Sequence, residues 1–335
     1  MHLANLQNQL VPQIEEHLQT FLEAQDFGRT KDLKQMLFEH MGWGTKGAGR
    51  GKRIRPLLTL LCTGAFGAPV EKALPGAAAI ELLHNFTLIH DDIEDQSPIR
   101  HGRPTLWTTW GTAQAINAGD ALFSIAQMAV LDVSETHDAH TACRAALEFN
   151  QVCLHLTRGQ HLDIALENQP STKIDTYLAM IRGKTAALIA HAAWMGGLAA
   201  GQDPGTLEIL SYFGESLGMA FQIQDDDLGV WGDPAVTGKS AASDLLARKK
   251  TLPVLYGLSH CPEFKEMWEN EVLTPNGIVA MAEHLRRCGA QVETRAKAEY
   301  YTKQAFTALD TLFPQKNNSA NALFELAQGL LERKS

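Results

Sequence analysis

Two clusters of aspartates are the side chains in this sequence best suited to chemistry. Asp91, Asp92 and Asp95 form the first cluster, and Asp225 begins a run of three aspartates at 225–227. On a helix, Asp91 and Asp95 share one face because they are four residues apart, and their like charges repel. Clustered carboxylates suit Mg²⁺, which takes a few carboxylates together with water and substrate phosphates. The clusters therefore indicate magnesium sites for a phosphorylated substrate.

Each acidic cluster follows a mostly apolar stretch, residues 80–89 for the first and 218–224 for the second. Burying unpaired carboxylates at the ends of such helices is costly, and divalent cations would relieve the cost. A single cluster of this kind could equally be a solvated helix end. Two clusters, each after an apolar stretch, favour the metal interpretation.

Basic side chains that could bind phosphate oxygens accompany the acids. Lys52 and Arg55 follow a glycine-rich segment and are three residues apart, so they can share a helical face. Arginine offers bidentate geometry and lysine a point charge. A basic run alone is more often a solvated face, so this assignment depends on the acidic clusters. Further candidate donors are Arg100, Lys184, Lys239 and Lys249.

Composition and charge exclude several other classes of protein. The net charge of −9 disfavours broad nucleic-acid binding. The five cysteines form no CxxC pair, so neither a disulfide framework nor a zinc site is indicated. Residues 232–240 resemble a nucleotide-binding P-loop, but the glycine spacing is one residue too long and no strand precedes it. The nucleotide interpretation is therefore rejected.

The spacing of apolar residues predicts the elements that position these side chains. Apolar residues recur mainly three or four positions apart, with no sustained alternation, which predicts an all-α fold. Breaks rich in glycine and proline are turn-sized, so residues 1–335 are interpreted as a single domain. The most apolar stretch, 185–201, is too short to span a bilayer, and the N-terminus lacks a signal peptide. No transmembrane segment and a cytoplasmic location are expected.

As a set, the motifs resemble the trans-polyprenyl diphosphate synthases, which include farnesyl and geranylgeranyl diphosphate synthases. The resemblance runs from about residue 48 to 257, the motif-bearing core of the domain. It implies a single-domain isoprenoid synthase-like helical bundle around a central cavity, and a homodimer. The motifs that carry it are GKRIRP, ELLHNFTLIHDDIED, RHGRPT, NAGDAL, GQHLD, GKT, FQIQDD, GDPAVTGK and DLLARKKTLP.

The resemblance implies three bound magnesium ions. Asp91 and Asp95, assisted by Asp92, match the ligands of two of them, and Asp225 matches the main ligand of the third. Gln160 is similar to a glutamine near that metal shell. The second acidic motif departs from the family pattern because its final aspartate is replaced by Gly229. Metal binding is expected to survive, since the first carboxylates remain.

The resemblance also assigns the two substrates, isopentenyl diphosphate and an allylic diphosphate. Lys52, Arg55 and His84 match the isopentenyl diphosphate site. The usual Arg-Arg-Gly becomes Arg-His-Gly, so His101 replaces an arginine that the family uses on this substrate. A protonated His101 could still donate a hydrogen bond. The residues that match contacts to the allylic diphosphate or to its developing cation are Arg100, Lys184, Lys239, Lys249, Thr185 and Gln222.

The implied reaction is ionisation, condensation and elimination, with catalytic roles for Asp91, Asp92, Asp95, Lys184, Thr185, Gln222 and Asp225. Chain length is expected to depend on a tunnel beside the first acidic helix. Phe86 and Thr87 lie about one turn before Asp91, and Leu122 and Phe123 are candidates for the tunnel floor. A large ring beside a small residue favours the twenty-carbon product, geranylgeranyl diphosphate, with the fifteen-carbon farnesyl product next.

Two alternatives to a chain-lengthening synthase remain. A class I terpene cyclase also uses DDxxD and magnesium, but its usual Asn/Asp-Ser-Glu triad is not found, and Lys52, Arg55 and His84 would be unexplained. A non-catalytic partner subunit of a heteromeric prenyl synthase is conceivable because of the departures at His101 and Gly229. The presence of both acidic clusters argues against it.

Overall fold

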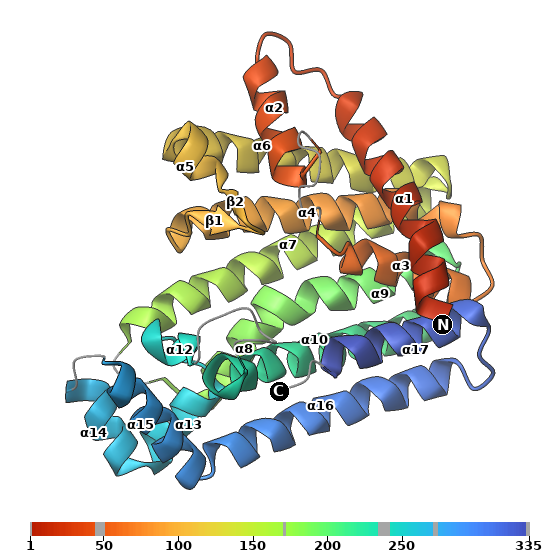
Figure 1. The fold of residues 1–335 in the computed structure, drawn as a ribbon. Coiled ribbons are helices and arrows are strands. Elements are labelled where there is room, and N and C mark those ends of the chain that lie inside the picture. The colour runs from red at the N-terminus through yellow and green to blue at the C-terminus, as the bar shows by residue number, and fades with distance from the viewer. Residues whose placement is uncertain (1, 44–50, 170–171, 234–241, 271–273, 333–335) are drawn as a thin grey trace. The chain divides into compact units, whose positions relative to one another are not determined.

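The protein is helical throughout the part of the chain that the structure describes. This computed structural model describes residues 2–43, 51–169, 172–233, 242–270 and 274–332 (Figure 1). Within those ranges the strands are a single pair of two residues each. The predicted all-α fold is confirmed.

The chain divides into two compact units. The N-terminal unit comprises Met1–Gln151, His191–Leu207 and Gln315–Leu323, and the C-terminal unit comprises Val152–Ala190, Glu208–Pro314 and Phe324–Ser335. Helices that contribute residues to both units are α7 (Ala139–Asn168), α9 (Ala187–Ala199), α10 (Pro204–Trp231) and α17 (Asn318–Leu331). The single-domain interpretation stays a prediction.

The N-terminal unit is built around helix α4 (Leu74–Glu94). Nearly every side chain from Pro75 to Leu83 is buried, as expected for a helix that is apolar on all sides. It runs beside α6 and also contacts α1, α2 and α3 (Figure 1). The other elements are α1 (His2–Glu23), α2 (Lys31–Met41), α3 (Ile54–Ala65), η1 (Val70–Ala73), β1 (Ile99–Arg100), β2 (Arg103–Pro104), α5 (Leu106–Trp110), α6 (Thr112–Leu131) and η2 (Asp132–Glu135).

A tight hairpin follows the acidic end of α4. Arg100 pairs with Arg103 across β1 and β2, leaving His101 and Gly102 as the two turn residues. Their φ angles are 51° and 74°, and two-residue hairpins of type I′ require positive φ at both central positions. Glycine adopts this conformation freely, whereas histidine does so rarely. The hairpin therefore fixes the backbone of His101 in an unusual conformation.

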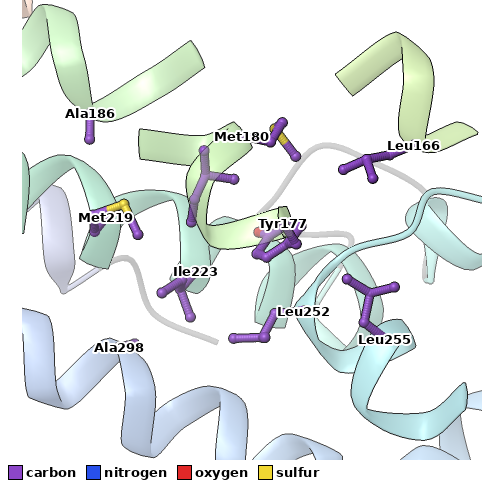
Figure 2. Close-up of a cluster of buried hydrophobic side chains, with 10 residues drawn as sticks. Leu166, Tyr177, Met180, Ala186, Met219, Ile223, Leu252, Leu255 and Ala298 are labelled. Carbon is purple, nitrogen blue, oxygen red and sulfur yellow. The ribbon is translucent and has the colours of Figure 1, made fainter. Parts of the chain in front are cut away.

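The C-terminal unit has a core to which several helices contribute. Figure 2 shows Tyr177 from α8 (Ile174–Ile181) among Met180, Ile223, Leu252 and Leu255, side chains that belong to one buried cluster. The remaining elements of this unit are η3 (Arg182–Ala186), α12 (Ser243–Leu246), α13 (Leu252–His260), α14 (Pro262–Asn270), α15 (Pro275–Arg287) and α16 (Ala290–Leu312).

The segment η3 is a π-helical turn, a geometry that is rare and often found at functional sites. It packs closely against α7. A Cβ atom on Gly159 would lie 2.1 Å from the backbone nitrogen of Lys184, and one on Gly183 would lie 2.8 Å from the carbonyl oxygen of His155. The two glycines therefore permit the close approach of η3 and α7.

Among the described residues, one helical segment, Thr112–Glu135, is long and apolar enough to cross a membrane by length and composition alone. Buried core helices of soluble proteins pass the same test. In this segment α6 packs along α4, and Leu122, Ala126 and Val130 are buried. One side of the segment therefore packs inside the N-terminal unit, and 44% of its most apolar stretch is buried.

Candidate active site

A single cavity in the N-terminal unit collects the basic residues predicted to bind isopentenyl diphosphate. Its volume is about 540 Å³. The side chains that line it include five predicted substrate ligands, Lys52, Arg55, His84, Arg100 and His101. They also include three residues that were not predicted, Glu39, His40 and Arg103. Elements α2, α3, α4 and the β1–β2 hairpin supply all of them except Lys52, which lies in the segment just before α3.

Arg55 and His84 form a contact pair in this cavity. The distance between Nη1 of Arg55 and Nε2 of His84 is 3.0 Å. Burial lowers the pKa of His84 well below its usual value, and the guanidinium of Arg55 lowers it further. His84 is therefore neutral and can accept a hydrogen bond from Arg55. Nε of Arg55 is buried and has no partner among the described residues, so it offers a donor to an anion.

Arg53 is two residues from Arg55 but has a structural role. Its guanidinium forms ion pairs with Glu15 at 2.5 Å and with Glu81 at 2.7 Å, and it donates to the carbonyl oxygen of Met41. Its φ of 45° turns the chain into α3. Arg53 therefore links α1, α2 and α4 at the wall of the cavity.

Helix α2 also lies over the cavity, held there by Arg103. The guanidinium of Arg103 donates to the carbonyl oxygens of Glu39 and His40 at 2.6 and 3.3 Å, at the end of α2. Burial lowers the pKa of His40 to about 3, so its ring is neutral. These contacts span more than 60 residues, so no local pattern could have predicted them.

The first acidic cluster lies at the C-terminal end of α4, beside the cavity. Arg100 donates from Nε to Oδ1 of Asp92 at 2.7 Å, and its Nη2 is 3.5 Å from Oδ2 of Asp91. Asp92 is buried, which raises its pKa, although Arg100 partly offsets this. Asp95 follows α4 directly, and its N–H donates to the carbonyl oxygen of Asp91, so the two keep their helical spacing. The carboxylate of Asp92 is thus paired with Arg100, while Asp91 and Asp95 are more exposed.

The chemistry of these carboxylates fits magnesium. Among the described residues, no group of three or more acids, histidines or cysteines forms a complete metal cage. Mg²⁺ is typically held by one or two carboxylates and completed by substrate phosphates. Asp91 and Asp95 offer two carboxylates of this kind, and Asp91 lies 3.5 Å from Arg100, which lines the cavity.

In the C-terminal unit, two aspartates of the second cluster are bonded to other side chains of the unit. Asp226 accepts a short hydrogen bond from the hydroxyl of Tyr177, one from the backbone N–H of Leu252 at 3.0 Å, and one from Gln222. Burial raises the pKa of Asp226 to about 7. Asp227 accepts from Nε of Arg295 at 3.0 Å. Asp225, the predicted metal ligand, is only half-buried.

A hydrogen-bonded chain joins Asp226 to the residues predicted near the developing cation. The hydroxyl of Thr185 donates to Oε1 of Gln222 at 2.9 Å, and Nε2 of Gln222 donates to Asp226. Lys184 forms an ion pair with Asp163 at 2.6 Å. Lys184, Thr185 and Gln222 therefore belong to one polar region of this unit.

Of three further predicted residues, the structure describes two. Gln160 is half-buried on α7, and Lys249 is exposed, with its backbone N–H donating to Asp244. Lys239 lies outside the described residues.

The position of Gly229, where the family pattern has an aspartate, is partly filled by another acid. A Cβ atom on Gly229 would lie 2.0 Å from Oδ2 of Asp244. The carboxylate of Asp244 therefore occupies the space beside α10 that a side chain at 229 would take. Asp244 lies in the quoted DLLARKKTLP motif, but its approach to Gly229 depends on tertiary packing.

The predicted chain-length residues lie on α4 upstream of Asp91. The ring of Phe86 packs on Phe123 of α6 with centroids 5.0 Å apart, and on His90 at 4.8 Å. The hydroxyl of Thr87 donates to the carbonyl oxygen of His84. Leu122 is fully buried, whereas Phe86 and Thr87 are half-buried.

Comparison with known proteins supports one family. The polyprenyl synthetase family model matches residues 45–282. The chain belongs to the polyprenyl synthetase family. A farnesyl diphosphate synthase and a geranylgeranyl diphosphate synthase of Mycobacterium tuberculosis are each 43% identical to it, over 234 and 232 residues. These matches cover 68% of this chain but only 64% and 65% of the relatives, slightly less than two thirds of their length.

Solved structures share the fold over nearly the whole chain. The geranylgeranyl pyrophosphate synthetase of Pyrococcus horikoshii superimposes with a TM-score of 0.88 at 30% identity, covering 99% of this chain and 98% of that one. The predicted isoprenoid synthase-like fold of the polyprenyl synthetase family is therefore confirmed.

Proposed function

We propose that the protein is a magnesium-dependent trans-prenyltransferase that joins isopentenyl diphosphate to an allylic diphosphate. The observation that carries the proposal is the position of Arg100. It lines the cationic cavity and also bonds Asp92 and approaches Asp91. The proximity of a cavity with cationic lining to the carboxylates at this end of α4 supports a reaction between two diphosphates.

The chain's own residues bind, align and stabilise charge in the proposed reaction. Lys52, Arg55 and His84 hold isopentenyl diphosphate so that its double bond can attack the allylic carbon once the carbon–oxygen bond has ionised. The diphosphate that leaves accepts the final proton, so no nucleophilic side chain is needed. The residues proposed to hold the allylic diphosphate or face its cation are Arg100, Lys184, Lys239, Lys249, Thr185 and Gln222.

We propose three magnesium ions, two at Asp91 and Asp95 and one at Asp225. When bound, they neutralise charge on the leaving diphosphate. Asp163, which pairs with Lys184, and Asp226, which pairs with Gln222, are proposed to orient these neighbours rather than to bind metal.

The proposed product is geranylgeranyl diphosphate, with farnesyl diphosphate as the alternative. The two mycobacterial synthases are equally identical to this chain, so overall identity does not separate the products. Support for the longer product comes from α4, where the small side chain of Thr87 adjoins the ring of Phe86 one turn before Asp91.

We further propose a cytoplasmic homodimer whose interface includes α6 and the start of α7. Large apolar side chains are exposed there: Ile116, Met128 and Leu131 on α6 and Leu147 on α7. A second copy of the chain would bury them. All five cysteines are free thiols, which agrees with a reducing compartment.

The proposal is tested by the products formed from labelled isopentenyl diphosphate, each allylic starter in turn and magnesium, with Asp91→Ala as the comparison. We expect a linear prenyl diphosphate that disappears in the variant and on chelation of magnesium. A cyclic hydrocarbon would instead indicate a terpene cyclase. Absence of turnover with every starter would indicate a non-catalytic partner subunit.

A further inference from the structure

The β1–β2 turn presents an ionisable group to the proposed isopentenyl diphosphate cavity where the family pattern has a permanent cation. His101 lines the cavity and is itself exposed, with Arg100 and Arg103 on either side of the turn. Arginine keeps its charge at every physiological pH, whereas imidazole gains or loses a proton near neutrality. The charge that the cavity offers an anion can therefore change at this position.

Burial and the neighbouring charges disfavour protonation of His101 before a substrate binds. Burial lowers the pKa of His101, the guanidiniums of Arg100, Arg103 and Arg53 lower it further, and Asp92 alone raises it. A bound diphosphate would bring several negative charges into the same cavity and reverse this balance. The imidazolium would then donate from both ring nitrogens.

The other ionisable side chains of the cavity do not compete for this proton. Desolvation lowers the pKa of His40 to about 3 and that of His84 well below its usual value, and the neighbouring guanidiniums lower both further. Glu39 accepts from the indole of Trp110 at 2.9 Å, and Glu81 is paired with Arg53. The remaining cavity groups with basic side chains are Lys52 and Arg55.

We propose that His101 takes up a proton when isopentenyl diphosphate binds, so that affinity for this substrate falls as the pH rises. The inference rests on the proposed function, because it takes isopentenyl diphosphate as the occupant of the cavity. It makes His101 a residue that sets the pH dependence of substrate binding.

The sign of this pH dependence follows from the linkage between proton uptake and substrate binding. Below the pKa of the free protein, His101 is already charged and binding takes up no proton. Between the pKa of the free protein and that of the complex, binding takes up one proton, and the dissociation constant rises by up to about tenfold per pH unit. Above the pKa of His101 in the complex, the dissociation constant no longer changes with pH.

The test compares the dissociation constant for isopentenyl diphosphate in the wild type, His101→Arg and His101→Asn from about pH 5.5 to about pH 9. Asparagine tolerates positive φ, and this chain already holds arginines there, at 53 and 248. All three proteins meet the same substrate, so ionisation of the substrate itself cancels in the ratios. Calorimetry in buffers of different ionisation enthalpy counts the protons taken up.

We expect the wild type to match His101→Arg at low pH and to approach His101→Asn at high pH, with proton uptake in the wild type that the arginine variant lacks. A ratio of wild type to His101→Arg that is constant with pH would overturn this inference while leaving the proposed function intact. Failure of all three proteins to bind isopentenyl diphosphate or form product would overturn the proposed function.

Discussion

The two acidic clusters use the same residue type but differ in what surrounds it. At the end of α4, Asp92 lines a cationic cavity and is bonded to Arg100, which also lies 3.5 Å from Asp91. On α10, Asp226 is held by three donors, and Asp227 by Arg295. The aspartates of one run therefore differ in their surroundings, because long-range donors from the same unit bond Asp226 and Asp227.

The largest expected effect separates a proposed metal ligand from its neighbour. Asp91→Asn should lower kcat by about 100- to 1,000-fold, because charge developing on the leaving diphosphate would lose a stabilising partner. Glu94→Gln, at an exposed position of the same helix, is the matched control and should change kcat little. A labelled-product assay measures kcat of both variants. Equal losses of kcat would contradict a special role for Asp91 relative to the exposed surface of the same helix.

The second-largest effect is expected in the free energy of unfolding when Asp226 is replaced. Asp226→Ala would leave the hydroxyl of Tyr177 and the N–H of Leu252 without an acceptor, at a cost of about 1–3 kcal/mol in the free energy of unfolding. Denaturant titration of the variant and the wild type measures this loss of stability. Tyr177→Phe and the double variant should show coupling between the two residues. Asp91→Asn should leave stability unchanged, and a loss similar to that of Asp226→Ala would contradict the contrast.

A smaller effect is expected at Gly229. Alanine there would meet the carboxylate of Asp244, so Gly229→Ala should destabilise the protein by about 1 kcal/mol despite the better helix propensity of alanine. Gly329 in α17 is the matched control, because a Cβ there meets nothing within 4 Å. Gly329→Ala should stabilise by about 0.5–1 kcal/mol. Thermal unfolding of both variants measures whether each substitution raises or lowers stability. A change in the same direction for both would be inconsistent with Asp244 filling the space beside Gly229.

The smallest effect concerns Asp227. Arg295, its partner, is half-exposed, with 49% of its side chain accessible. Solvent screening limits such pairs, so Arg295→Ala should cost about 1 kcal/mol or less in unfolding free energy and should leave kcat unchanged. A large fall in kcat would place Asp227 in the active site with Asp225.

Much of this contrast could not have been read from the sequence. Apolar spacing identified the helices, and the acids and cations stood out because they interrupt apolar runs. Which aspartate is satisfied internally depends on partners far along the chain, such as Tyr177 for Asp226, 49 positions away. The same applies to Arg53 and Arg55, which both line the cavity: Arg53 is paired with Glu15 and Glu81, whereas Arg55 contacts the neutral His84.

The most direct test of the central claim is a crystal structure of the protein with isopentenyl diphosphate, magnesium and an unreactive allylic thiodiphosphate. The account predicts a diphosphate in the cavity of the N-terminal unit, in contact with Lys52, Arg55 and His84, and a metal ion bound by Asp91 and Asp95. A diphosphate bound elsewhere, or magnesium held by Asp226 and Asp227 instead, would contradict it.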